Sequence, residues 1–162
     1  MQKPFKVPVT SVATHPTESS TIALGFIDGR IACYSFHFVN NRFQELWSSR
    51  LKRSIRALEF STCGTLLFAI SANRAICVYE FNTGTRLRCV KKSHSSAPNV
   101  LQVLPSWVSN QQSTIFICMC VYIAYVVASG SENGEACVLN WVEGWQVIFR
   151  SGLGILGCNP LL

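Results

Sequence analysis

Apolar and polar positions alternate along this chain in short segments that end in turn residues. Each segment is shorter than a typical helix, and Val, Ile, Phe, Thr and Tyr are frequent in it, which favours β-strands. Strands are predicted at residues 9–14, 21–26, 30–36, 43–49, 55–60, 66–71, 75–81, 85–90, 126–130 and 135–141. The pattern therefore predicts an all-β fold.

The predicted strands repeat as a unit. Thr21–Tyr34 and Leu66–Tyr79 each contain an apolar run, a turn and an alternating run that ends in an aromatic residue, and Val126–Leu139 has the same order. The first two of these segments lie 45 residues apart. Asp-Gly and Asn-Gly supply the positive φ that a tight hairpin needs. The predicted turn residues are Asp28, Gly29, Asn73, Asn133 and Gly134.

The repeats divide the chain into four predicted regions. Residues 1–53 and 54–97 are two units, and residues 98–141 are an incomplete third unit with an apolar insertion at about 113–125. Residues 142–162 are a Gly-rich tail outside the repeats. A period of about 40–45 residues built from short strands is typical of β-propeller blades, and closed propellers have about four to eight of them. We therefore expect a partial propeller.

Three segments resemble the WD repeat-containing protein 55 family: Gln44–Ser49, Ile55–Phe60 and Lys91–Pro98. The resemblance covers about residues 8–106 and resumes at 128–141. It implies a seven-bladed WD-repeat propeller of antiparallel four-stranded blades, of which this chain supplies about three. It also implies that His94, in the loop before the third unit, hydrogen-bonds the turn residue Asn133.

The functional expectations come from the same resemblance. It implies a non-enzymatic protein-interaction scaffold in the nucleus and nucleolus, with the cytoplasm as the alternative location. The implied role is ribosomal RNA production and ribosome biogenesis, with protein partners that include pre-ribosomal particles. Because the insertion and the tail depart from the repeat, we expect the chain to be a truncated or aberrant product.

Positive charge adds a second hypothesis. The chain has 14 basic and 8 acidic residues, a net charge of +6. Two basic clusters lie around the fourth strands of the first two units and the loops into the next unit, and we predict that neighbouring units align them into one patch that contacts RNA phosphates or an acidic partner. The alternative is a solvated outer strand whose charges discourage edge pairing. The clusters are Arg50, Lys52, Arg53 and Arg56, and Arg86, Arg88, Lys91 and Lys92.

The remaining chemistry argues against an enzyme. Eight cysteines and three histidines lack the spacing of a zinc site, and no nucleophile lies beside a base in sequence. We expect no metal, cofactor or small-molecule ligand. The amino terminus lacks an apolar run, so we expect no signal peptide and reduced, buried thiols. Trp47 is predicted to pack between neighbouring blades.

An uncharged stretch at residues 113–128 leaves one further alternative, a membrane-associated fragment. The stretch has about fifteen uncharged residues, whereas a membrane-spanning helix needs about 20. Its many β-branched residues favour a buried or aggregation-prone strand instead.

Overall fold

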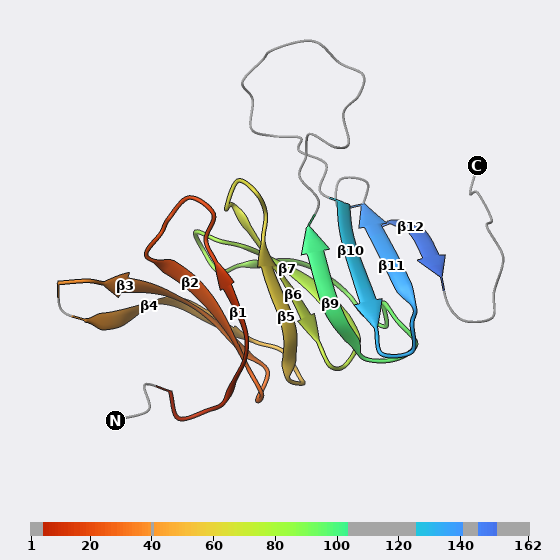
Figure 1. Ribbon diagram of the computed structural model, residues 1–162, viewed down its shortest axis with the longest axis horizontal. Coiled ribbons are helices and arrows are strands. Elements are labelled where there is room, and N and C mark those ends of the chain that lie inside the picture. Colours follow the sequence, from red (N-terminus) through yellow and green to blue (C-terminus); the bar gives the residue numbers. More distant parts are fainter. Residues whose placement is uncertain (1–4, 40, 104–125, 141–145, 152–162) are drawn as a thin grey trace, which may run out of the picture.

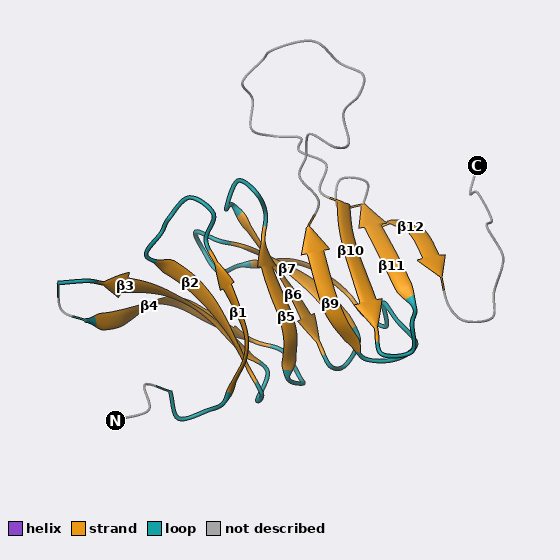
Figure 2. Ribbon diagram, in the orientation of Figure 1, coloured by secondary structure: helices purple, strands orange, loops and turns teal. Residues whose placement is uncertain are grey.

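The computed structural model describes residues 5–39, 41–103, 126–140 and 146–151. These residues form twelve strands and no helix, as Figures 1 and 2 show. Within the described ranges, no helix has the length and hydropathy needed to cross a membrane. The insertion predicted at 113–125 and most of the 113–128 stretch lie outside the described residues, so both interpretations of that stretch stay predictions.

The strands form three antiparallel four-stranded sheets in which sequential strands are neighbours. The first sheet contains β1 (Val9–Thr14), β2 (Thr21–Phe26), β3 (Arg30–His37) and β4 (Arg42–Arg50). The second contains β5 (Ile55–Phe60), β6 (Leu66–Ser71), β7 (Ala75–Glu80) and β8 (Arg86–Val90). The third contains β9 (Pro98–Val103), β10 (Val126–Ser131), β11 (Ala136–Asn140) and β12 (Gln146–Ser151). The predicted all-β fold with four-stranded antiparallel units is confirmed.

The second sheet is buried on both faces, which explains why its middle strands are continuously apolar. Side chains alternate between the faces of a strand. Leu67 and Ala69 of β6 face a core shared with the first sheet, whereas Phe68 and Ile70 face a core shared with the third. Every residue of β6 is buried. The central sheet therefore holds its two neighbours through opposite faces.

The first strands of the three sheets, β1, β5 and β9, lie side by side, and the sheets fan out from them (Figure 1). Thr10 Oγ1 of β1 donates to the Ile55 carbonyl at 2.6 Å, which ties the first two of these strands together. Trp47 of β4 stacks on Tyr79 at 5.9 Å between ring centroids, and its Nε1 donates to the Phe81 carbonyl at 2.6 Å. Trp47 thus packs between neighbouring sheets, as predicted.

Two strands of the third sheet were not expected from the sequence. β9 begins at a proline and was not predicted as a strand. β12 pairs with β11 but lies in the segment predicted as a tail outside the repeats, so the tail prediction is wrong for Gln146–Ser151. The remainder of that segment, residues 142–145 and 152–162, lies outside the described residues.

Candidate functional site

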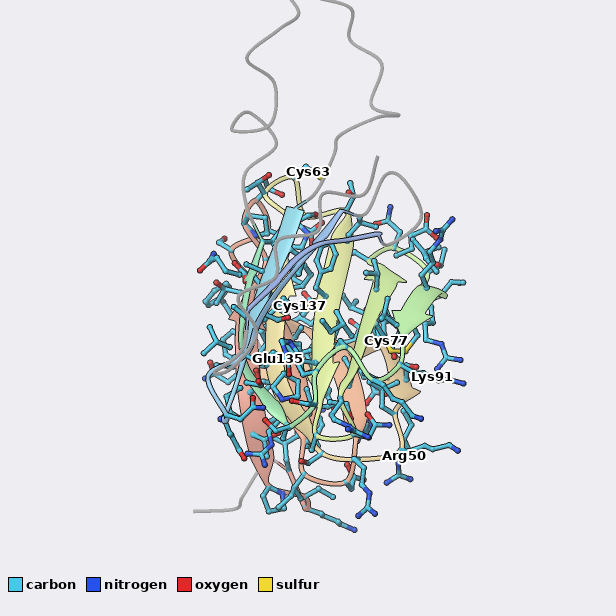
Figure 3. The ribbon with its side chains drawn as sticks, turned by 90° about the vertical axis from the view of Figure 1, so that its right-hand side faces the viewer. Arg50, Cys63, Cys77, Lys91, Glu135 and Cys137 are labelled. Carbon is cyan, nitrogen blue, oxygen red and sulfur yellow. A yellow bond between two sulfur atoms is a disulfide. The ribbon has the colours of Figure 1, made fainter. Side chains whose placement is uncertain are left out.

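A basic pocket of about 500 Å³ lies at one end of the first and second sheets. The segment that follows β4, the turn between β6 and β7, and the segment that follows β8 all reach this end and line the pocket. Figure 3 shows Arg50 and Lys91 at the same edge of the molecule, with Cys77 beside them. The cationic residues that line it are Arg50, Lys52, Arg74, Arg86, Lys91 and Lys92.

The structure brings together five of the eight basic residues proposed for partner contact. Arg50 and Lys52 of the first cluster line the same pocket as Arg86, Lys91 and Lys92 of the second. This is the alignment that the repeat predicted. Contact with a partner or with RNA stays a prediction.

Three residues of the clusters do not line this pocket. Arg56 on β5 faces the third sheet instead, where its guanidinium lies 3.7 Å from a Glu132 carboxylate oxygen. The carbonyl of Arg53 accepts a hydrogen bond from Ser71 Oγ at 3.1 Å. Arg88 lies on β8 opposite Val78. The clusters therefore divide between a shared pocket and separate positions.

Negative charge near the pocket is sparse. Arg50 pairs with the Asp28 carboxylate, whose other oxygen accepts the Arg30 backbone N–H at 3.1 Å. Lys52, Lys91 and Lys92 form no ion pair with any carboxylate in the described part of the chain. The pocket therefore carries a surplus of positive charge that can attract an anion.

Sequence analysis missed one cation of the pocket, Arg74. Its φ is +67°, in the left-handed region that favours glycine. The equivalent turn residues of the other sheets are Gly29 and Gly134, with φ of +88° and +79°. All three donate their backbone N–H to the carbonyl three residues earlier, at 2.9 to 3.1 Å. The signal in the sequence is an Asn-Arg turn where the other repeats have Asp-Gly and Asn-Gly.

The predicted turn residues hold the hairpins. At Gly29 a Cβ atom would lie 2.3 Å from the Leu51 carbonyl oxygen, so the close approach of residues 51–53 requires glycine. Asn73 sits at the matching turn of the second sheet and lines the basic pocket. Asn133 Oδ1 accepts a hydrogen bond from Ser131 Oγ at 2.6 Å, within its own turn before Gly134.

The expected pair between His94 and Asn133 is wrong. His94 is buried, and its Nε2 lies 2.7 Å from Ser129 Oγ on β10. Its Nδ1 lies 3.9 Å from the carboxylate of buried Glu135. Asn133 instead contacts Ser95, donating from Nδ2 to Oγ at 2.7 Å. The turn residue is exposed, so the buried imidazole meets the hydroxyl and carboxylate that point inward.

Glu135 is the centre of this polar network. Its Oε2 accepts hydrogen bonds from the Ser95 backbone N–H and from Ser95 Oγ, both at 2.7 Å. The network fastens the loop that precedes β9 to the hairpin of β10 and β11. We assign these contacts a role in stability, because each of them joins the loop before β9 to another part of the third sheet.

The cysteines differ in part from the reduced, buried thiols that were expected. Cys77 and Cys89, cross-strand partners on β7 and β8, form a disulfide, and Cys89 lines the basic pocket. Cys63 is exposed. Cys33 and Cys137 are buried, and burial raises the pKa of the Cys33 thiol to about 12. Cys33 is therefore protonated at neutral pH and a poor nucleophile.

A second pocket, of about 540 Å³, lies on the outer face of the first sheet. Its lining combines charged residues with aromatic side chains that include Phe26, Tyr34 and Phe43. Burial raises the pKa of Tyr34, and its hydroxyl donates to Glu45 at 3.1 Å. In the part of the chain that the structure describes, no three His, Cys, Asp or Glu side chains gather as a metal site.

The chain is similar in sequence to WD repeat-containing protein 55. It is 32% identical to the human protein over 135 residues, which are 83% of this chain and 30% of that protein. It is 33% identical to the rat protein over 98 residues, 60% of this chain and 25% of that one. The chain thus spans between a quarter and a third of the length of these relatives. No protein-family model matches it.

Two solved structures share the fold. The crystal structure of Saccharomyces cerevisiae Sqt1 superposes with a TM-score of 0.71 at 22% identity, covering 89% of this chain and 38% of that one. The C-terminal WD40 domain of Sif2 superposes with a TM-score of 0.70 at 14% identity, covering 91% of this chain and 38% of that one. Both likenesses concern the fold alone. They agree with the predicted partial propeller of four-stranded sheets.

Proposed function

Because this chain is a WD-repeat protein with sequence similarity to WD repeat-containing protein 55, we propose that it is a protein-interaction scaffold that acts in ribosomal RNA production and ribosome biogenesis. We further propose that it works in the nucleus and nucleolus, on pre-ribosomal particles. It binds through the ends of its sheets and their loops, without bond chemistry.

The observation that carries the scaffold function is the combination of fold and surface. Three four-stranded sheets use their apolar side chains for packing on each other, so the loops at the sheet ends are left for partners. One such end has six cationic residues from two sheets in a single pocket. The candidate site is thus suited to binding an anionic surface, and pre-ribosomal particles are strongly anionic.

The scaffold proposal is tested by sedimentation. The epitope-tagged protein, expressed at its native level in the cells it comes from, is separated on a sucrose gradient and located by immunoblot. We expect a substantial fraction to sediment with pre-ribosomal particles and to shift when the particles are dissociated with EDTA. A tag found only at the top of the gradient contradicts the proposal.

A further inference from the structure

Holding the six cationic residues of the basic pocket close together destabilises the folded state unless an anion binds there. Lys91 and Lys92 are adjacent, and they share the pocket with Lys52 and Arg74. Like charges in one pocket repel each other. Among the described residues, Asp28 is the acidic residue that forms an ion pair with a cation of this pocket, Arg50. We propose that the pocket binds a phosphorylated peptide segment of a protein partner.

The backbone of the β6–β7 turn supports the proposal independently of charge. Arg74 adopts a φ of +67° in a turn where the first and third sheets have glycine. A non-glycine residue in this conformation is strained, and such strain is concentrated at functional sites. Lys92, also in the pocket, has a φ of +57°. Glycine would suit both backbones better, whereas only the longer residues provide a cation to the pocket.

The geometry suits a phosphate group. The pocket has a volume of about 500 Å³, within the range of small-ligand sites. Its cations come from two sheets and surround a concave space. Arg74 Nη1 donates to the Ser95 carbonyl at 3.0 Å, and the remaining N–H groups of the guanidinium can donate to phosphate oxygens, while lysine ammonium groups add point charges. Clusters of this kind recognise phosphorylated peptides.

The lining favours a peptide over RNA. Proteins that bind single-stranded RNA stack bases on aromatic side chains. None of the described residues that line this pocket is aromatic. Leu51 and Ala75 also line the pocket, but both are buried in the core between the first two sheets, so the accessible lining is mainly cationic. The proposal rests on the scaffold function proposed above, and it names the chemistry of the partner.

The binding test uses the full chain and three fluorescein-labelled probes. These are a short acidic peptide that carries two phosphoserines, the same peptide without phosphate, and a single-stranded oligouridylate of similar charge. Fluorescence anisotropy is measured at about 150 mM salt, where exposed charges are screened beyond about 8 Å. We expect the phosphopeptide to bind at least about tenfold more tightly than either other probe. A tenfold difference corresponds to about 1.4 kcal/mol of added interaction between the phosphates and the cations.

Arg74→Gly distinguishes a binding role from a structural role. It removes a cation, relieves the backbone strain and deletes the exposed hydrogen bond from Arg74 Nη1 to the Ser95 carbonyl, so we expect phosphopeptide affinity to fall about tenfold while the melting temperature changes by only a few degrees. Lys91→Gln combined with Lys92→Gly should reduce affinity further. The control is Arg42→Gln, which removes one positive charge from the other end of β4 and should leave affinity within about twofold.

Two results overturn the proposal. One is oligouridylate binding as tight as that of the phosphopeptide, which would assign the pocket to RNA. The other is phosphopeptide binding that Arg74→Gly and the lysine substitutions leave unchanged. Gradient sedimentation tests the scaffold function separately. If the chain sediments with particles but does not bind the phosphopeptide, the phosphopeptide site is refuted and the scaffold function is not.

Discussion

The two interfaces of the second sheet differ in how polar groups supplement their apolar cores. Towards the first sheet, neutral side chains donate to backbone carbonyls: Thr10 to Ile55, and Trp47 to Phe81. Towards the third sheet, the acceptor is a carboxylate, because Glu59 receives hydrogen bonds from Gln102 and from the backbone N–H of Val103, at 2.7 and 3.0 Å. The first interface thus depends on shape and the second also on charge.

This difference teaches that equivalent positions in a repeat need not do equivalent work. Gly25 on β2 and Gly130 on β10 occupy the same place in the repeat, and the second sheet has Ile70 there. A Cβ atom on Gly25 would lie 2.5 Å from Ile55 Cγ2, whereas one on Gly130 would lie 3.9 Å from Val100 Cβ. Gly25 thus faces the tightly packed first interface, whereas Val100 is the cross-strand partner of Gly130 within the third sheet and is exposed, so Gly130 lies on the face turned away from the second sheet.

The largest expected effect comes from Gly25→Ala. The new methyl group would overlap Ile55 and force the two sheets apart, so we expect the free energy of unfolding to fall by about 3 kcal/mol. Gly130→Ala is the matched control, and it should change stability by less than about 1 kcal/mol, with a gain expected from reduced freedom of the unfolded chain. Urea unfolding followed by tryptophan fluorescence measures both. Equal losses for the two variants would contradict the difference in packing.

The next effect concerns the polar network of the third sheet. His94→Ala removes the buried ring that contacts Ser129 Oγ and lies near Glu135, leaving a cavity and buried polar atoms. We expect a loss of about 2 kcal/mol, measured by thermal unfolding. Exchange of backbone amides in β10 should accelerate more than exchange in β2. Uniform acceleration over all three sheets would show that the network does not act locally.

Trp47→Phe tests the neutral hydrogen bonds of the first interface. Phenylalanine keeps a ring beside Tyr79 but leaves the Phe81 carbonyl without the indole donor. We expect a loss of about 1 kcal/mol in urea unfolding, with no change in its pH dependence. A loss that appears only at acidic or only at basic pH would assign the effect to a charged group instead.

The smallest effect is the pH dependence of the second interface. Burial raises the pKa of Glu59, although the Val103 N–H partly opposes this. Since the folded pKa exceeds the unfolded value of about 4.3, the stabilisation by this group is present below that value and is lost as pH rises through the folded pKa. Glu59→Gln should therefore flatten the melting temperature profile between the unfolded pKa of about 4.3 and the raised folded pKa.

The matched control for this profile is Glu132→Gln, which removes an exposed ion pair with Arg56 at 3.7 Å. Exposed pairs contribute little, so its profile should resemble that of the unsubstituted chain. Parallel profiles for Glu59→Gln and the unsubstituted chain would show that the charge of Glu59 does not affect the stability of the second interface.

Sequence alone predicted the first two sheets well because their physics is local. Alternation and turn residues placed β1, β2, β5 and β6 at the bounds that the structure has. The third sheet was harder, since residues 104–125 separate β9 from β10 and interrupt the period. β12 follows Glu143 and Gly144, which the repeat pattern did not identify as a hairpin turn.

The candidate site divides in the same way. The repeat placed most of the two basic clusters at one end of neighbouring sheets, because both clusters lie around a fourth strand and the segment after it. It could not supply Arg74, whose importance depends on the φ of one turn residue. The repeat pattern also could not predict which residue His94 contacts, because this depends on burial: Asn133 is exposed, whereas Ser129 points inward.

The central claim is that two neighbouring sheets together form the partner site of this scaffold. Hydrogen–deuterium exchange of the full chain, with and without the phosphoserine peptide, tests it most directly. The account predicts slower exchange confined to three segments, residues 50–52, 73–75 and 91–92. Protection of only one sheet, or of the aromatic pocket around Tyr34, would contradict a site shared between the sheets.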